Sequence, residues 1–511
     1  MLHNSIYVRQ TLRERNGSAV AMERRDPHRT VRLDRSRRAG PGELELTGGW
    51  KVEGDRYTPG IPEAMADLAD FLLRLGVKVD ERGTNRIALS LDGMVAHGAF
   101  RLTAEEHAIE VRASNMQGLW AGLVYLEKEM AARNAPIVPL GTTARAPSWR
   151  AQISQPPYGA SFLVPDLSPA TLSDDAFRLL AHSGVNGMLI YGDWLCYVRS
   201  ERYPELNHPD YDVNMMMLRD AAQRAKRYGV TLYYVPVGPK LASDHPLFQR
   251  RPDVRGAKLQ NGAAKPAKRL SCLCTSHPEN LQFHGEAMAD LFRQAPELGG
   301  LVLIVGGEAF KHCYMRADLS GLAPGVKTNC PRCAERVAED TVSEFVGAVS
   351  EAVHRERPEA DVLVWEYSAH LWSGDPDQLQ LIGKLPADTS LLTTLDKGQW
   401  VEKDGYRKHI WDYSAEYAGP ADRTVVQTDA ARRRALPFFL KMETAIGLEC
   451  VQFPYVPALR GIGNKWDGVK ALRPAGVIQS WFFFGMWASR AEEMGWWASW
   501  RPEMRTGEGI R

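Results

Sequence analysis

Two glutamates in this chain directly follow runs of apolar residues. Glu308 comes after Leu301-Val302-Leu303-Ile304-Val305 and two glycines, and Glu443 comes after Phe438–Met442. A run of branched apolar residues is typical of a strand buried on both faces, as in a parallel sheet. In a βα-barrel, the residues just past the strands meet at one mouth. Glycoside hydrolysis needs two carboxyl groups there, one protonated and one ionised. Glu308 is therefore the candidate proton donor, and Glu443 the candidate nucleophile or base.

Polar and aromatic residues lie at the ends of the other candidate strands in a similar way. Aromatic faces can stack on a pyranose ring, and carboxylates and arginine can hold its hydroxyls. The residues that we expect to bind the sugar are Arg150, Asp193, Trp365, Tyr367 and Asp396. Two alternatives stay open: a solvated Glu308 at a glycine turn, and a Glu443 paired with Lys441 or with one of the arginines at 432–434.

Four cysteines have the spacing of a metal site. Cys330-Pro331-Arg332-Cys333 is a C-x-x-C pair, and Cys274 and Cys313 precede it. Such a set suits tetrahedral zinc, with Cys272 or His312 as a substitute ligand. The zinc would be structural, because an all-thiolate site leaves no position for water. Buried unligated thiols are the alternative. We expect no cofactor for catalysis.

The elements that must position these residues alternate from Trp149 onward between strand and helix patterns, which indicates parallel α/β architecture. Strands are predicted at Trp149–Ser154, Gly187–Tyr191, Thr231–Val237, Leu301–Val305, Val362–Trp365, Ser390–Leu395, Phe438–Met442 and Val477–Phe483. Helices are predicted at Ser173–Ser183, Val213–Tyr228, Pro278–Gln294, Ala334–Arg357, Gln378–Lys384, Asp429–Ala435 and Asp467–Leu472. Eight strands with intervening helices predict a (β/α)8 TIM barrel over residues 147–511. An open doubly wound sheet is the main alternative, but Gln155-Pro156-Pro157-Tyr158 is not the glycine-rich phosphate loop that such a sheet normally has.

Residues 42–146 are predicted to form a small α+β domain. Residues 86–91 alternate like a strand, and 99–103 with 107–112 are predicted to form a hairpin around Glu105-Glu106. Apolar residues at helical spacing follow from Asn115 to Met130, with Gly118 and Gly122 allowing close packing on the sheet.

The stretch FRLTAEEHAIEVRASNMQGLWAGLVYLEKEM, from Phe100 to Met130, resembles the end of the non-catalytic N-terminal domain that precedes the barrel in β-N-acetylhexosaminidases and α-glucuronidases. The resemblance implies that a TIM barrel follows this domain. Residues 146–154 are similar to the first barrel strand of those families, which implies that Arg150 contacts the terminal sugar. In β-N-acetylhexosaminidases the fourth strand ends Gly-Gly-Asp-Glu; the Glu is the acid, and the Asp orients the 2-acetamido group that acts as nucleophile. This chain reads Gly306-Gly307-Glu308-Ala309, so Glu443 or Asp396 would have to supply the second carboxylate.

Length, charge and cysteine content limit the class of protein. A chain of 511 residues is long enough for two domains or a barrel with an appendage. The net charge of +1 gives no reason to expect nucleic acid or an anionic membrane as partner. There is no apolar run long enough to span a membrane and no apolar centre of a signal peptide. Seven cysteines, an odd number, argue against a secreted disulfide framework, so a cytoplasmic location is expected.

Residues 1–41 are rich in arginine and poor in apolar side chains, which predicts a disordered basic tail. It is either a native tail or an upstream extension, if the chain naturally starts at Met22.

Together these patterns predict a glycoside hydrolase that cleaves a terminal sugar, with a β-N-acetylhexosaminidase-like substrate as the leading hypothesis. The first alternative is an exo-glycosidase acting on uronic acids, for which Arg150, Lys240 and Lys397 would form a cationic pocket. The second is a catalytically silent carbohydrate-binding barrel. The expected partner is a carbohydrate, and the sequence leaves open whether the chain forms a homo-oligomer.

Overall fold

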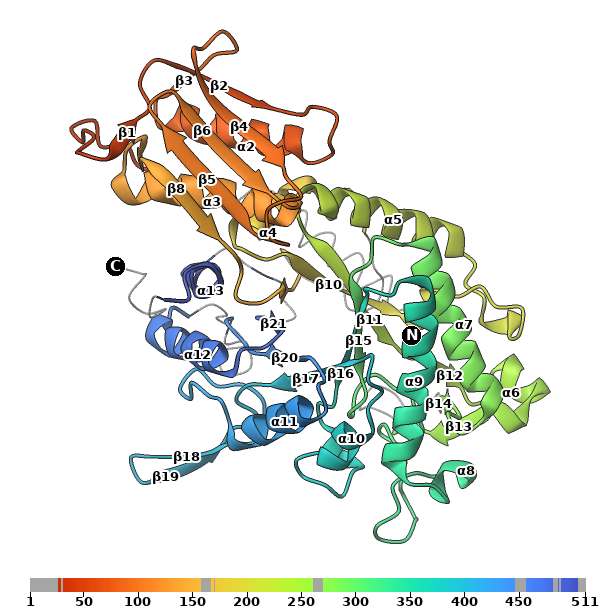
Figure 1. Cartoon of the computed structure of the whole chain (residues 1–511). Helices are drawn as coiled ribbons and strands as arrows, with labels where there is room; N and C mark the ends of the chain where they lie inside the picture. Colours follow the sequence, from red (N-terminus) through yellow and green to blue (C-terminus); the bar gives the residue numbers. More distant parts are fainter. Residues whose placement is uncertain are drawn as a thin grey trace.

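A computed structural model describes residues 26–28, 31–157, 167–169, 171–260, 270–445, 456–480, 486 and 489–503. Within these ranges the chain forms a closed barrel and a separate N-terminal sheet (Figure 1). No helix among the described residues is long and apolar enough to cross a membrane.

The barrel consists of eight strands that pair only in parallel, in the order β10-β11-β15-β16-β17-β20-β21-β9. The strands are β9 (Ala151–Ser154), β10 (Gly187–Asp193), β11 (Thr231–Val237), β15 (Gly300–Ile304), β16 (Asp361–Trp365), β17 (Ser390–Thr394), β20 (Phe438–Lys441) and β21 (Gly476–Ile478). Most are buried at every position, as expected for strands that face a barrel interior on one side and helices on the other. The predicted (β/α)8 barrel is confirmed, and the open sheet is excluded.

Helices cover the outside of the barrel (Figure 1). They are α4 (Asp174–His182), α5 (Tyr211–Arg227), α7 (Pro278–Gln294), α9 (Ala338–Glu356), α10 (Leu379–Lys384), α11 (Asp422–Arg433), α12 (Leu459–Leu472) and α13 (Arg490–Trp500). Short elements lie in the connections: η1 (Trp194–Tyr197), η2 (Pro204–Leu206), β12 (Lys240–Ala242), α6 (Pro246–Arg250), η3 (Pro252–Val254), β13 (Arg255–Lys258), β14 (Leu270–Leu273), α8 (Pro331–Ala334), η4 (Ala369–Leu371), β18 (Trp400–Lys403) and β19 (Tyr406–His409).

The N-terminal part is a six-stranded sheet of order β3-β2-β4-β6-β5-β8, with two helices packed on it. Its elements are β2 (Gly49–Gly54), α2 (Ile61–Arg74), β3 (Lys78–Val79), β4 (Asn85–Leu91), β5 (Phe100–Glu105), β6 (Ala108–Ala113), α3 (Met116–Arg133) and β8 (Gly141–Arg145); β1 (Glu43–Glu45) pairs separately with β7 (Ile137–Pro139). Asn115 begins α3 by accepting a hydrogen bond from the Gly118 backbone N–H (3.0 Å). A Cβ on Gly118 would lie 2.3 Å from the Ala99 carbonyl oxygen, so α3 can approach the sheet closely only because glycine stands there.

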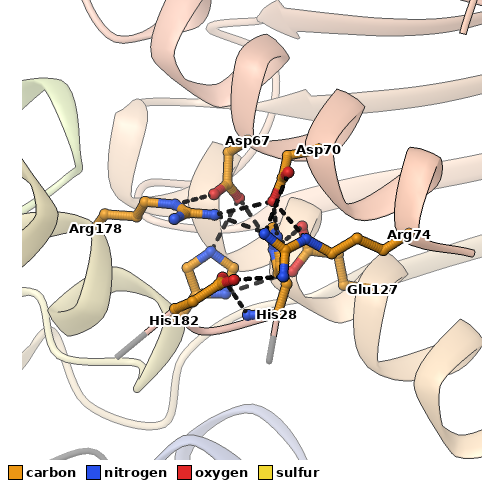
Figure 2. A network of polar contacts seen from close by, with 8 residues as sticks. His28, Asp67, Asp70, Arg74, Glu127, Arg178 and His182 are labelled. Atoms are coloured by element: carbon orange, nitrogen blue, oxygen red, sulfur yellow. Dashed lines mark hydrogen bonds and ion pairs between the residues drawn. The ribbon is translucent and has the colours of Figure 1, made fainter. Parts of the chain in front are cut away.

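A buried network of charged residues joins this sheet domain to the barrel (Figure 2). Asp67 of α2 accepts hydrogen bonds from Arg178 and from His182 (2.9 Å), both on barrel helix α4. His28 lies 3.4 Å from the Glu127 carboxylate of α3 and 2.9 Å from that of Asp70. The prediction of a disordered tail therefore does not hold for His28, which is buried; residues 1–25, 29 and 30 of that tail lie outside the described residues.

Candidate active site

The mouth at the carboxyl end of the barrel collects most of the predicted site residues. Asp193 and Trp365 end β10 and β16, Glu308 follows β15, Asp396 follows β17 and Glu443 follows β20. Because all eight strands run in parallel, these positions lie at the same end of the barrel. The predicted placement of the carboxylates at one end is confirmed, while their chemical roles stay predictions.

Glu308 is an accessible carboxylate of this group, with 43% of its side chain exposed. Burial of its carboxyl group raises its pKa, and the nearby negative charge of Asp412 adds to the effect. Arg316 and Lys397 act in the opposite direction but do not cancel the rise. The Arg316 guanidinium lies 3.6 Å from Glu308 and also donates to the Gly307 carbonyl (2.8 Å). A carboxyl group with a raised pKa is suited to holding a proton near neutral pH.

Gly306 and Gly307 let the loop that carries Glu308 lie directly against the loop after β16. A Cβ on Gly306 would lie 1.2 Å from the Tyr367 carbonyl oxygen. The Gly306 carbonyl also accepts a hydrogen bond from the Trp372 indole (3.0 Å). The glycine pair is thus needed for the contact between two barrel loops.

A compact ion-pair cluster stands beside Glu308. Lys397 donates to one oxygen of Asp412 (2.7 Å), and the Tyr367 hydroxyl donates to the other (2.8 Å). The Lys397 ammonium also lies over the Tyr367 ring, 4.9 Å from its centre, and over the Trp411 ring, 4.6 Å from its centre. Asp412 was not among the predicted site residues; its only sequence signal was its place in a loop after a barrel strand.

Glu443 lies on the β20 side of the mouth and is almost fully buried. One of its oxygens accepts hydrogen bonds from the Ala445 backbone N–H (3.0 Å) and from the Ser480 hydroxyl (3.4 Å). Both donors stabilise a negative charge on this carboxylate. Burial lowers the pKa of neighbouring Lys441 to about 7, against the opposing attraction of Glu443 and Asp396.

Tyr191 interacts electrostatically with both predicted catalytic residues. It is fully buried and accepts a hydrogen bond from the Gln155 amide (2.7 Å). Burial raises its pKa, and the charges of Glu443 and Glu308 raise it further. Both carboxylates therefore act on one tyrosine hydroxyl of the barrel interior. The segments 446–455 and 481–485, which follow β20 and β21, lie outside the described residues, and so does the end of the predicted strand Val477–Phe483.

Three of the predicted sugar ligands have other partners in the structure. Arg150 precedes β9 and so lies at the amino end of the barrel, where it pairs with Asp361 (2.6 Å), the first residue of β16. Asp396 is fully buried, and one of its oxygens accepts from Lys465 (2.6 Å) and from a backbone N–H. Trp365 is also fully buried, and it supports the Tyr367 ring, whose centre lies 4.8 Å away.

The remaining predicted sugar ligands, Tyr367 and Asp193, are partly or fully accessible at the mouth. Tyr367 is half-buried, and Asp193 is exposed although its carboxyl group is partly desolvated, which raises its pKa. One Asp193 oxygen accepts from the Leu195 backbone N–H (3.0 Å), which begins η1. The cationic pocket of the uronic-acid alternative would lack Arg150, which pairs with Asp361, and the charge of its Lys397 is already paired with that of Asp412.

The four predicted metal ligands come together between the end of β14, the loop after β15 and α8. The sulfurs of Cys274, Cys313, Cys330 and Cys333 all lie within 4.8 Å of one another, and all four residues are buried. Four thiolates at such distances have the donor set of a closed zinc site.

Comparison with known proteins finds likeness in three dimensions. No protein-family model and no curated sequence matches the chain. A glycoside hydrolase family 138 enzyme targeting pectin rhamnogalacturonan II matches with a TM-score of 0.54 and 11% identity over 85% of this chain, which spans 58% of that enzyme. An inactive mutant of a family 20 exo-β-N-acetylglucosaminidase from Vibrio harveyi matches with a TM-score of 0.54 and 11% identity; the match covers 92% of this chain and 73% of that enzyme. Another family 20 β-N-acetylglucosaminidase matches with a TM-score of 0.53 and 14% identity; the match covers 91% of this chain and 90% of that enzyme. At these identities the likeness establishes the fold: a TIM barrel with a small N-terminal sheet domain, as the resemblance to hexosaminidases implied.

Proposed function

We propose that this protein is a glycoside hydrolase that removes a terminal sugar, with a β-N-acetylhexosaminidase-like substrate, and that Glu308 protonates the leaving oxygen. The observation that carries the proposal is Glu308 itself: an accessible carboxyl group with a raised pKa at the barrel mouth. The shared fold with family 20 and family 138 glycoside hydrolases supports the reaction class.

The second carboxylate in this proposal is Glu443, as nucleophile or base. Glu443 accepts hydrogen bonds from the Ala445 backbone N–H and the Ser480 hydroxyl, as a carboxylate can, whereas the environment of Glu308 raises its pKa. Glycoside hydrolysis needs one carboxyl group that holds a proton and one that acts as a carboxylate, and these two environments suit those roles. This chain has one acidic residue, Glu308, where β-N-acetylhexosaminidases have an Asp-Glu pair, which is why the proposal gives the second role to Glu443.

Asp412 enters the proposal as a positioning residue. Its charge raises the pKa of Glu308, and its own charge is compensated by Lys397 and the Tyr367 hydroxyl. Removing that charge with Asp412→Asn would lower the pKa of Glu308 and move the alkaline limb of the rate profile to lower pH.

The test is a panel of aryl and alkyl glycosides that includes N-acetylhexosaminides and glucuronides. Glu308→Gln is expected to lower kcat by roughly 10²–10⁴-fold on substrates with poor leaving groups and much less on activated ones, because good leaving groups depart without protonation. Glu402→Gln, which changes an exposed glutamate of the β18–β19 hairpin, is the matched control and should keep full activity.

Chemical rescue tests the second carboxylate. Azide should restore turnover to Glu443→Gly and give a glycosyl azide of inverted configuration if Glu443 is the nucleophile. Full activity of Glu308→Gln on an alkyl glycoside would refute the acid assignment. Wild-type protein that binds sugars from the panel but cleaves none would favour the silent carbohydrate-binding barrel.

A further inference from the structure

We propose that Cys274, Cys313, Cys330 and Cys333 bind one structural Zn²⁺ ion that fastens the loop after β15 to the end of β14, a strand of the small β12-β14-β13 sheet. The Cys274 sulfur lies 3.6 Å from that of Cys330 and 3.9 Å from that of Cys333. Four sulfurs placed about 2.3 Å from a zinc ion at the corners of a tetrahedron are separated by about 3.8 Å. The four thiols therefore already stand close to the geometry that tetrahedral zinc requires.

The cluster draws its ligands from three separate segments. Cys274 follows β14, Cys313 lies in the loop after β15, and Cys330 and Cys333 flank the start of α8. All of these cysteines are free, whereas a disulfide would bring two sulfurs to about 2.0 Å. Thiolates are the soft ligands that zinc and iron prefer, and four of them leave no open position for a reacting water. The arrangement thus indicates a closed structural site rather than a second catalytic centre.

Nearby polar groups hold the ligand-bearing backbone in place. The Ser276 hydroxyl lies 3.2 Å from the Cys333 sulfur and accepts from Arg336 (3.3 Å). The Thr328 hydroxyl donates to the Cys313 carbonyl (2.6 Å) and accepts from the Cys330 backbone N–H (3.2 Å). Such outer contacts orient metal ligands, and the cationic Arg336 offsets part of the negative charge of a four-thiolate site.

The two substitute ligands considered from the sequence do not fit. The His312 ring is engaged on both nitrogens, with the Val305 carbonyl at 2.8 Å and the Tyr314 backbone N–H at 3.3 Å. The Cys272 sulfur lies 3.8 Å from that of Cys313 but is directed to the Ala257 carbonyl (3.7 Å), and it is not one of the four mutually close sulfurs.

The zinc would restrain the segment that carries Arg316, which lies between Cys313 and Cys330. Arg316 donates to the Gly307 carbonyl and pairs with Glu308. Metal loss would loosen this segment beside Glu308. This consequence for activity rests on the proposed function, whereas metal binding itself does not.

The test is metal analysis of the full chain, purified without chelator from zinc-supplemented medium. The expected result is about one zinc per chain, bound with release of thiol protons. Cys330→Ser and Cys333→Ser should lose the metal and melt at a lower temperature. Cys272→Ser should keep the metal; Cys272 lies on β14, two residues before the ligand Cys274. Should the serine variants fail to fold, Co²⁺ exchanged into the wild type should give the visible absorption of tetrahedral thiolate-bound cobalt.

Three outcomes would overturn the proposal. They are folded wild type that stays metal-free after incubation with Zn²⁺, iron in place of zinc in the purified protein, and loss of zinc from Cys272→Ser with retention in Cys313→Ser. Metal content and melting temperature do not depend on a sugar substrate, so failure of this proposal is distinguishable from failure of the proposed glycosidase activity.

Discussion

His28→Gln should remove a pH-dependent part of the stability of this protein. His28 is buried between the sheet domain and barrel helix α4, with charged groups facing it from α2, α3, α4 and its own segment (Figure 2). These groups are Asp26, Asp67, Asp70, Arg74, Glu127, Arg178 and His182. Burial lowers the pKa of His28, but hydrogen bonding and attraction to Glu127, Asp67 and Asp70 outweigh it and raise the pKa to about 9.

The magnitude follows from linkage between proton binding and folding. The unfolded chain has a histidine pKa of 6.5, so the rise to about 9 at about 1.4 kcal/mol per pH unit corresponds to about 3 kcal/mol. Because the folded pKa is the higher one, this stabilisation is complete below about pH 6.5 and is lost as the pH rises through about 9. Burial also raises the pKa of Glu127, which makes the free energy of unfolding fall with rising pH in the same direction, so the variant must be compared with wild type at each pH.

Urea unfolding followed by tryptophan fluorescence measures the effect. At each pH, the free energy of unfolding of His28→Gln is subtracted from that of the wild type. This difference should be about 3 kcal/mol larger at about pH 6 than at about pH 9.5. His97→Gln, at an exposed position of the sheet domain, is the control and should show no such difference. A wild-type advantage of constant size across this range would refute the charged network between the two parts of the chain.

Three further predictions concern the barrel. Gly306→Ala should destabilise the protein by more than the roughly 1–3 kcal/mol of ordinary overpacking, because its Cβ would overlap the Tyr367 backbone; melting and kcat/KM should both fall. Lys465→Met should cost about 3–5 kcal/mol in urea unfolding, because it leaves Asp396 buried without its cationic partner. Arg150→Ala should lower the melting temperature but leave KM unchanged, because Arg150 lies at the end of the barrel opposite the mouth.

Each of these has a contrasting variant. Gly383→Ala, in α10 with open space around it, should be neutral or stabilising by up to about 1 kcal/mol. The double change Asp396→Leu with Lys465→Met should recover most of the stability lost with the lysine alone. Equal losses for the two glycine variants, no recovery in the double variant, or a raised KM for Arg150→Ala would each contradict the corresponding argument.

The barrel and the position of its mouth could be predicted because they depend on local pattern. Branched apolar runs form strands that are buried on both faces, and parallel strands of a closed barrel end on one side. The start of α11 at Asp422 and of α12 at Leu459 was missed by several residues, since exposed valines in one and glycines in the other blur the helical spacing.

The partners within the site could not be predicted in the same way. Whether Asp396 faces a sugar or Lys465, 69 positions away, depends on where helix α12 lies relative to the loop after β17. Arg150 was placed at the mouth by resemblance, but it stands before its strand rather than after it and therefore lies at the other end of the barrel.

The sequence by itself determined which residues follow the strands and that four cysteines have metal-site spacing. The tertiary structure alone decided that Asp412 compensates Lys397 beside Glu308, and that His28 pairs with carboxylates of α2 and α3. The reason is physical: strand and helix patterns arise from neighbours in the chain, whereas the pairing of a buried charge depends on which distant side chain shares its desolvated space.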